Sequence, residues 1–266
     1  MKKLIFLIAL LLTFQMGWAQ KEQGLGHVVI LGDSETWIGG DKCNGERGWS
    51  TWFAKETKPA SCRSYARSGA TWTCTENTKE TIEEYSEKLS DNNVIYNQMQ
   101  RLNMACLLGE QPVPDVIFIA AGTNDVWFSK KRPRLYDAKQ LAEYNATIAP
   151  SRLQTLTDAF LCITRILSER YPNARIVVLT PFQCIRVSDA EIGRIGDLME
   201  QLAQTATKDN IPVDIIRMDK LSPVKSRIER AQRQYTYDGV HTNKAGAMKH
   251  GNIVATELKH ILATDK

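Results

Sequence analysis

Short apolar runs alternate with longer amphipathic stretches over most of the chain. Apolar runs bounded by turn residues are typical of buried strands, whereas apolar residues spaced three or four apart are typical of helices. The runs predict strands within residues 27–34, 62–70, 115–125, 174–181 and 213–218. The helical spacing predicts helices within residues 45–55, 153–171 and 192–207, one long or two broken helices within 82–108, and a last helix near the carboxyl terminus.

This alternation predicts an α/β fold in which helices cover both faces of a parallel sheet. The run within residues 115–125 is continuously apolar, which is expected of a strand at the centre of such a sheet. The chain has 266 residues, 43% of them hydrophobic, which is enough for a sizeable core. No linker or internal repeat divides it, so residues 20–266 are expected to form a single domain.

The first residues have the pattern of a secretory signal peptide. Lys2 and Lys3 precede an apolar run over residues 4–12, and small residues follow up to Ala19. We expect cleavage after Ala19, so that residues 1–19 are a leader and the mature protein is periplasmic or extracellular. A membrane anchor is the alternative, but the run is shorter than the ~20 residues of a spanning helix. No cysteine follows the run to carry a lipid, so we expect no stable membrane anchor.

Charge and cysteine content narrow the class of protein without identifying a partner. Loss of the two leader lysines lowers the formal net charge from +4 by two, which does not favour nucleic acid or a membrane surface. Cys106 and Cys162 lie in apolar helical patterns and are expected to be buried thiols. Cys43, Cys62 and Cys74 lie among Gly, Ser and Thr residues and are better disulfide candidates in an exported protein. The sequence does not select a pairing or an oligomeric state.

Candidate chemistry begins with Ser34, which ends a Gly-Asp-Ser sequence just after the first expected strand. Open α/β sheets bind ligands at the carboxyl ends of their strands, close to the N-terminal ends of the following helices. The Ser34 hydroxyl is therefore a candidate nucleophile. A serine that only caps the helix is the alternative interpretation.

Two more positions follow other expected strands. Asn124 comes directly after the central apolar run, in the same topological position as Ser34. An Asx turn that closes the strand is the alternative for Asn124. Gly69 follows the second expected strand, where the backbone can approach a ligand closely or simply form a turn.

Asp238 and His241 lie three residues apart, just before the last expected helix. At this spacing a turn can bring the carboxylate to imidazole Nδ1–H and leave Nε2 free to act as a base. A capping turn with a surface histidine is the alternative. No Cys-x-x-Cys or His-Glu-x-x-His pattern occurs, so no metal and no cofactor are expected.

Taken in order, four segments resemble the sequence blocks of the SGNH hydrolases, also called GDSL esterases and lipases. They are Gly-Asp-Ser ending at Ser34, then Gly69, then Gly-Thr-Asn-Asp beginning at Gly122, and Asp-Gly-Val-His ending at His241. The resemblance spans nearly the whole mature chain and implies a flavodoxin-like three-layer α/β/α sandwich with a central, mainly parallel five-stranded sheet. Two departures stand out: Glu35 replaces the apolar residue common after Gly-Asp-Ser, and the usual asparagine upstream of Gly69 is absent.

The resemblance also implies roles for these residues. Ser34 would be the nucleophile, His241 its base and Asp238 the partner that orients the histidine. The backbone N–H groups of Ser34 and Gly69 and the side-chain amide of Asn124 would form the oxyanion hole. No Gly-x-Ser-x-Gly sequence occurs, which disfavours the α/β-hydrolase solution to the same chemistry.

These features predict a secreted serine esterase that removes acetyl or other short acyl groups, with a small-molecule or oligosaccharide ester as its partner. Carbohydrate is favoured by three tryptophans expected beside the crevice, Trp37, Trp72 and Trp127. Residues 126–150 lack periodicity and combine aromatic residues with Lys130, Lys131 and Arg132, so this loop could contact a glycan or be solvated surface. A lipid esterase, lysophospholipase or thioesterase is the alternative, and a non-catalytic carbohydrate-binding protein is a third.

Overall fold

A computed structural model describes residues 24–79 and 93–264 of the chain. Its centre is one sheet of five parallel strands in the order β2-β1-β3-β4-β5. This is the flavodoxin-like order, and it confirms the predicted α/β class. The strands are β1 (His27–Gly32), β2 (Ser61–Ser64), β3 (Val116–Ala120), β4 (Arg175–Leu179) and β5 (Val213–Ile216).

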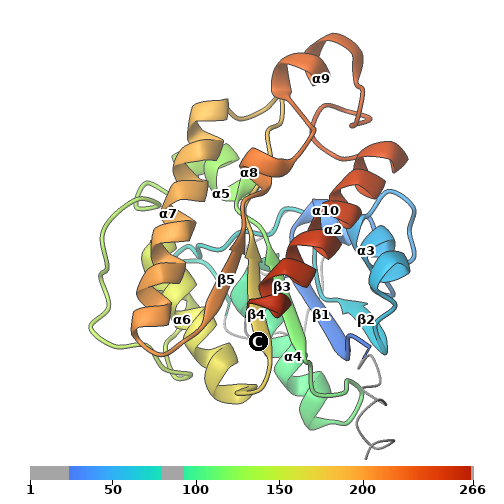
Figure 1. Cartoon of the computed structure of the whole chain (residues 1–266). Helices are drawn as coiled ribbons and strands as arrows, with labels where there is room; N and C mark the ends of the chain where they lie inside the picture. The colour runs from blue at the N-terminus through green and yellow to red at the C-terminus, as the bar shows by residue number, and fades with distance from the viewer. Residues whose placement is uncertain (1–23, 80–92, 265–266) are drawn as a thin grey trace, which may run out of the picture.

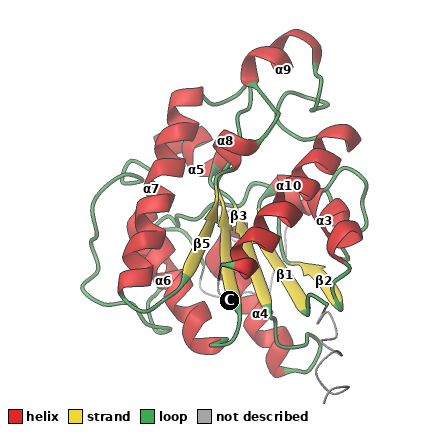
Figure 2. Ribbon diagram, viewed as in Figure 1, coloured by secondary structure: helices red, strands yellow, loops and turns green. Residues whose placement is uncertain are grey.

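Helices cover both faces of the sheet, which makes the fold a three-layer sandwich (Figures 1 and 2). One face packs against α3 (Trp49–Thr57) and α10 (Lys244–Ala263). The other packs against α4 (Ile95–Leu107), α6 (Leu156–Arg170) and α7 (Asp189–Lys208). The short helices are α2 (Ser34–Trp37), α5 (Thr123–Trp127), α8 (Met218–Leu221) and α9 (Ser226–Gln232).

Alternation along each strand divides the core into two apolar layers. In β1, Val28 and Ile30 face the α3 and α10 layer, whereas Val29 and Leu31 face the other layer. All four side chains are fully buried because helices cover both faces. In the first layer the rings of Phe53 and Phe118 meet edge to face, with centroids 5.1 Å apart. The strand ends that carry polar residues are thus held by a rigid core.

Most of the predicted elements are present with shifted ends. The strand expected within 213–218 ends at Ile216, and α8 begins at Met218. The stretch that follows Val126 is partly helical, since α5 ends at Trp127 and a 3-10 helix, η2 (Ser129–Lys131), comes directly after it. A second 3-10 helix, η3 (Pro150–Arg152), precedes α6.

Some predictions fall outside the described residues. They are the signal peptide over residues 1–19 and the first part of the helix expected within 82–108. None of the helices in the described ranges is both long and apolar enough to cross a membrane.

The cysteines are free in this structure, so none of the disulfide candidates Cys43, Cys62 and Cys74 is in a disulfide. Cys43 and Cys62 form a hydrogen-bonded thiol pair, in which Cys62 lowers the pKa of Cys43. Cys74 packs in the other core layer, so it has no reach to that pair. Cys162 is fully buried as predicted, whereas Cys106 is only half-buried.

Candidate active site

The sheet topology brings two of the predicted site residues to neighbouring strand ends. Ser34 begins α2 directly after β1, and Asn124 lies in the first turn of α5 directly after β3. β1 and β3 are adjacent and parallel, with Gly32 paired to Ala120. The two residues therefore lie at the same edge of the sheet, where a crevice is expected.

His241 joins Ser34 from the opposite end of the chain. Its Nε2 lies 2.9 Å from the Ser34 hydroxyl, and its Nδ1 lies 2.7 Å from the Asp238 carboxylate. The serine, the imidazole and the carboxylate thus form one continuous chain of hydrogen bonds. In this arrangement the imidazole can take the hydroxyl proton while the carboxylate stabilises the charge that the ring acquires.

Asp238 is held as a carboxylate. Partial burial acts to raise its pKa, but hydrogen bonds from the His241 ring and from backbone N–H groups outweigh burial and keep the pKa below its usual value. The second carboxylate oxygen accepts the N–H groups of Val240 and His241, at 2.9 and 2.7 Å. These bonds fix the carboxylate plane against the ring.

Residues 235–243 form the histidine loop, which carries both Asp238 and His241. The loop closes on itself through a bridge between Thr236 and Thr242. Gly239 at its tip has φ +90°, and a Cβ there would lie 2.4 Å from Ile185, so this position requires glycine. The loop thereby has one tight conformation.

Two buried glutamates fasten the histidine loop to its surroundings. Glu229 of α9 accepts the backbone N–H groups of Tyr235 and Thr236, at 2.9 and 3.0 Å. Glu35 of α2 accepts the backbone N–H of Thr242 at 3.0 Å and lies 3.0 Å from the Thr242 hydroxyl. Neither contact was predicted, because each joins residues that no local pattern links. The Glu35 departure from the family sequence was the one signal available for the second contact.

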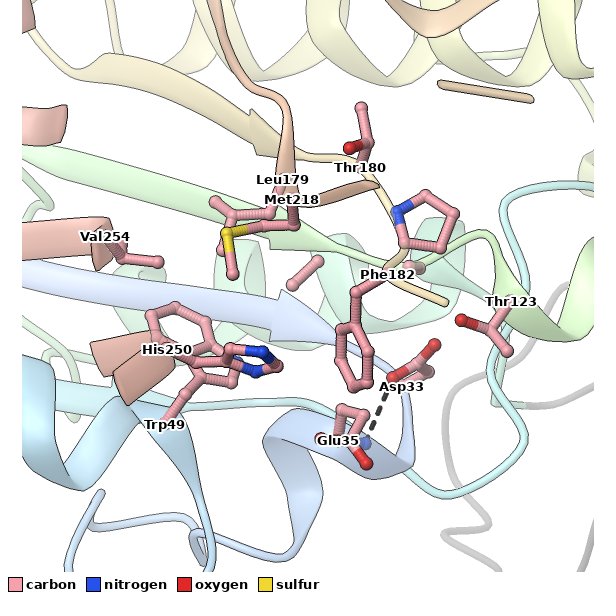
Figure 3. A pocket seen from close by; sticks show the side chains of 13 residues that line it. Asp33, Glu35, Trp49, Thr123, Leu179, Thr180, Phe182, Met218, His250 and Val254 are labelled. Atoms are coloured by element: carbon pink, nitrogen blue, oxygen red, sulfur yellow. Dashed lines mark hydrogen bonds between the residues drawn. The ribbon is translucent and has the colours of Figure 1, made fainter. Parts of the chain in front are cut away.

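A small cavity lies beside Asp33 and Glu35, between the carboxyl ends of β3 and β4 and α10 (Figure 3). It has a volume of about 30 Å³, enough for roughly two water molecules. In Figure 3 the Phe182 ring lies between His250 and Asp33, and it meets the His250 ring edge to face with centroids 4.5 Å apart. Burial lowers the pKa of His250 to about 3, so this histidine is neutral, and it shares a hydrogen bond of 2.7 Å with the Ser222 hydroxyl.

Asp33 borders this cavity and caps α2 by accepting the Glu35 N–H at 3.1 Å. Burial raises the pKa of Asp33 to about 7, opposed by that hydrogen bond and reinforced by the nearby charge of Asp125. Burial and the Asp33 charge likewise raise the pKa of Glu35. Ser34 is thus flanked in the sequence by two carboxyl groups that hold protons more tightly than ordinary acids.

The predicted oxyanion-hole groups lie in a fixed frame. Asn124 donates one amide hydrogen to the carbonyl of Ala70 at 3.0 Å, which joins it to the residue after Gly69. Within the described ranges, nothing accepts the second Asn124 hydrogen or the backbone N–H groups of Ser34 and Gly69. Gly69 has φ +75°, which suits glycine at that turn.

Two residues to which the sequence analysis gave no role hold this frame. Asp125, beside Asn124, accepts the N–H groups of Trp72 and Thr73, each at 2.9 Å. Gln98 of α4 pairs with both the N–H and the carbonyl of Gly32, at 2.8 and 2.9 Å. These contacts fix the end of β1 and the segment after Gly69 relative to Ser34.

The three predicted tryptophans have different surroundings. Trp72 is 0% exposed, stacks on Phe160 and donates its indole N–H to the Ala121 carbonyl, so its prediction as a substrate contact is wrong. Trp37 is half-buried, three residues after Ser34 on α2. Trp127 is 37% exposed, three residues after Asn124 on α5. Helical residues three apart share a face, so the last two can border the site.

The cationic residues of the loop after Trp127 also separate into two kinds. Lys130 and Lys131 are exposed. Arg132 is buried, donates to the Thr71 hydroxyl at 3.1 Å and acts on Asp125 by its charge. Arg132 is therefore a structural residue, and its expected use as a glycan contact is wrong.

Two exposed aromatic rings, Tyr237 and Trp127, each have an arginine beside them. Tyr237 stacks on the His241 ring with centroids 5.8 Å apart, and the Arg47 guanidinium lies 4.9 Å from the Tyr237 centroid. Arg186 lies 5.8 Å from the Trp127 ring. Among the described residues, no group of three or more His, Cys, Asp or Glu side chains could hold a metal ion.

A model of the GDSL-like lipase/acylhydrolase family matches residues 30–249 of the chain. No curated protein matches. Solved structures share the fold at low sequence identity. A GDSL-like lipase from Parabacteroides merdae has a TM-score of 0.56 and 18% identity, over 87% of this chain and 95% of that one.

Two further solved structures share the fold. A GDSL-like lipase from Bacteroides uniformis has a TM-score of 0.55 and 19% identity, over 89% of this chain and 97% of the other. An active-site mutant of a family two carbohydrate esterase from Clostridium thermocellum has a TM-score of 0.53 and 13% identity, over 89% of this chain and 64% of that one. Both support the three-layer fold.

The raised pKa of Asp33 predicts a pH dependence of stability. The native state binds the Asp33 proton more tightly than the unfolded state does, so stability should fall as pH rises from about 4 through about 7. Asp33→Asn keeps an oxygen for the Glu35 N–H and removes this titration. We expect it to raise the melting temperature at pH 8 by roughly 5 °C relative to wild type, with little change at pH 4. Exposed Asp189→Asn is the control, and equal pH slopes in all three proteins would contradict the prediction.

Proposed function

Because the chain belongs to the GDSL-like lipase/acylhydrolase family of the SGNH superfamily, we propose that it is an exported serine esterase that removes acetyl or other short acyl groups from carbohydrate. The observation that carries this proposal is the hydrogen-bonded chain from Ser34 through His241 to Asp238. Export rests on the leader-like sequence of residues 1–19.

In the proposed reaction, His241 Nε2 takes the hydroxyl proton as Ser34 Oγ bonds to the ester carbonyl carbon. The carbonyl oxygen becomes an oxyanion that accepts from the N–H groups of Ser34 and Gly69 and from the Asn124 amide. The protonated imidazole then gives its proton to the departing alcohol oxygen, which leaves an acyl-Ser34 ester. Water, deprotonated by His241, then bonds to the acyl carbon; the bond to Ser34 Oγ breaks, the imidazole returns the proton to Oγ, and the carboxylic acid is released. Asp238 stays ionised throughout.

A short acyl group is supported by the space beside the nucleophile. A cavity lined by Ser34, Asn124, Phe182, Cys184 and Val240 has a volume of about 10 Å³, enough for roughly one water molecule. A methyl group is of similar size, whereas a long acyl chain would need these buried side chains to move.

Carbohydrate as the alcohol component is supported by two features. The exposed Trp127 ring near Asn124 offers an apolar face of the kind that packs on sugar rings. One solved structure with this fold is a carbohydrate esterase. The exposed Lys130 and Lys131, together with Arg47 and Arg186, would suit a glycan that also carries negative charge.

Replacing the nucleophile tests the reaction itself. Ser34→Ala should lower kcat for p-nitrophenyl acetate by about 10³-fold or more, since no other group would form the acyl-enzyme. The melting temperature should stay close to that of wild type, because the side chain faces the crevice and not the core. Hydrolysis at the wild-type rate by a folded Ser34→Ala protein would exclude this serine as nucleophile.

Replacing Asn124 tests the proposed oxyanion hole. Asn124→Ala should lower kcat by roughly 10²-fold with a smaller change in KM, because an oxyanion donor acts mainly on the transition state. Steady-state kinetics on p-nitrophenyl acetate measure both constants. A change in KM alone would make Asn124 a substrate-binding residue instead.

Substitutions of Trp127 and of its neighbouring lysines test whether the substrate is a glycan. Trp127→Ala, or Lys130→Gln with Lys131→Gln, should lower turnover of an acetylated acidic oligosaccharide several-fold, since each contact contributes about 1 kcal/mol. Turnover of p-nitrophenyl acetate should hardly change, because a small ester does not use remote contacts. Lys208→Gln, at the far end of α7, is the control. Equal losses on both substrates would assign the loop to active-site structure, and preference for long-chain esters would favour a lipid esterase.

A further inference from the structure

Glu35 and Thr242 connect the two ends of the proposed catalytic pair. Glu35 directly follows Ser34, and Thr242 directly follows His241. The Glu35 carboxyl meets Thr242 at two points: one oxygen accepts the backbone N–H, and the other lies 3.0 Å from the hydroxyl. This contact runs parallel to the hydrogen bond between Ser34 and His241, one residue further along each segment.

The Thr242 hydroxyl has one hydrogen and two oxygen neighbours. It lies 2.9 Å from the Arg47 carbonyl, which can only accept, and 3.0 Å from Oε2 of Glu35. If Glu35 were ionised, both neighbours would be acceptors, and one of them would receive no hydrogen. If Oε2 carries a proton, it donates to the Thr242 hydroxyl, which in turn donates to the Arg47 carbonyl. Only the neutral acid satisfies every contact.

The surroundings also oppose a charge on Glu35. The side chain is buried, and the nearest acidic groups come from the end of β1 and from the histidine loop. Within the described ranges no lysine or arginine forms an ion pair with it. The titratable groups that face it are Asp33, Asp238, Tyr237, Cys184 and His250.

We propose that Glu35 is a neutral carboxylic acid that acts as a positioning residue, holding Ser34 and His241 at reacting distance through Thr242. The inference rests on the proposed esterase function and deepens it. An apolar residue at position 35, as is common in the family, would leave the buried Thr242 N–H without its present acceptor. Deprotonation at alkaline pH would remove the donor to the Thr242 hydroxyl and place a negative charge beside Asp238.

A matched pair of variants tests the donor requirement. Glu35→Gln keeps one donor and one acceptor in the same shape, so it should retain most of the wild-type kcat on p-nitrophenyl acetate. Glu35→Leu removes both and should lower kcat roughly 10- to 100-fold with little change in KM, because small displacements of reacting groups have effects of this size. A kcat for Glu35→Gln as low as that for Glu35→Leu would overturn the proposal.

The partner residue supplies a second pair, should Glu35→Leu fail to fold. Thr242→Ser keeps the hydroxyl and should retain activity, whereas Thr242→Val removes it at nearly constant shape and should lower kcat. In wild type the rate should also decline at alkaline pH as Glu35 loses its proton, and Glu35→Gln should lack that decline. Identical alkaline profiles in the two proteins, or equal kcat for the Thr242 pair, would contradict the proposed role.

Infrared spectroscopy tests the protonation state without using activity. The difference spectrum of wild type minus Glu35→Gln at neutral pH should contain a protonated carboxyl band. A carboxylate band in its place would overturn the proposal. The infrared measurement does not depend on the reaction. If Ser34→Ala proves fully active, the proposed esterase mechanism fails, but the infrared spectrum still decides whether Glu35 is protonated.

Discussion

The hydrogen bond between Ser34 Oγ and His241 Nε2 is the constraint on which the rest of the site depends. It joins residues that are 207 positions apart, over 2.9 Å. A parallel sheet delivers the serine to its carboxyl edge, but the sheet by itself places no residue of the histidine loop. Other contacts must therefore close the loop and fasten it next to β1. Its internal bridge and the tight turn at Gly239 close the loop.

Buried carboxyl groups supply the remaining restraints. Glu229, Glu35 and Asp125 each accept backbone N–H groups from a segment that borders the site. A buried acid is costly unless its oxygens are hydrogen-bonded, and backbone donors meet that need without adding a positive charge. The result is a frame of amide donors and carboxyl acceptors around Ser34. Burial raises the pKa of Asp33 within the same frame, so the local charge is kept low on the side of the serine that faces the core.

Aromatic residues show how the same residue type serves either the core or the surface. Trp72 lies in the segment after Gly69, and its buried side chain stacks on Phe160, so it supports the site from inside. Trp127 lies on the first turns after β3 and remains partly exposed. The difference follows from the contacts of each side chain, since Trp72 packs on Phe160 and bonds the Ala121 carbonyl. Arg132 and Lys130 differ in the same way, since the arginine is buried against Thr71 and the lysine is exposed.

The sequence by itself determined the α/β class, most of the helices and strands, and the positions of Ser34, Asn124, Asp238 and His241. These depend on local patterns: an apolar run, a polar residue at its end, and a spacing of three before a helix. Only the tertiary structure decided the contact of Glu35 with Thr242, the pairing of Gln98 with Gly32, the burial of Trp72 and Arg132, and the two-layer distribution of the cysteines. Each of these joins segments far apart in the chain, where a carboxyl, an amide or an indole has many possible partners and packing selects one.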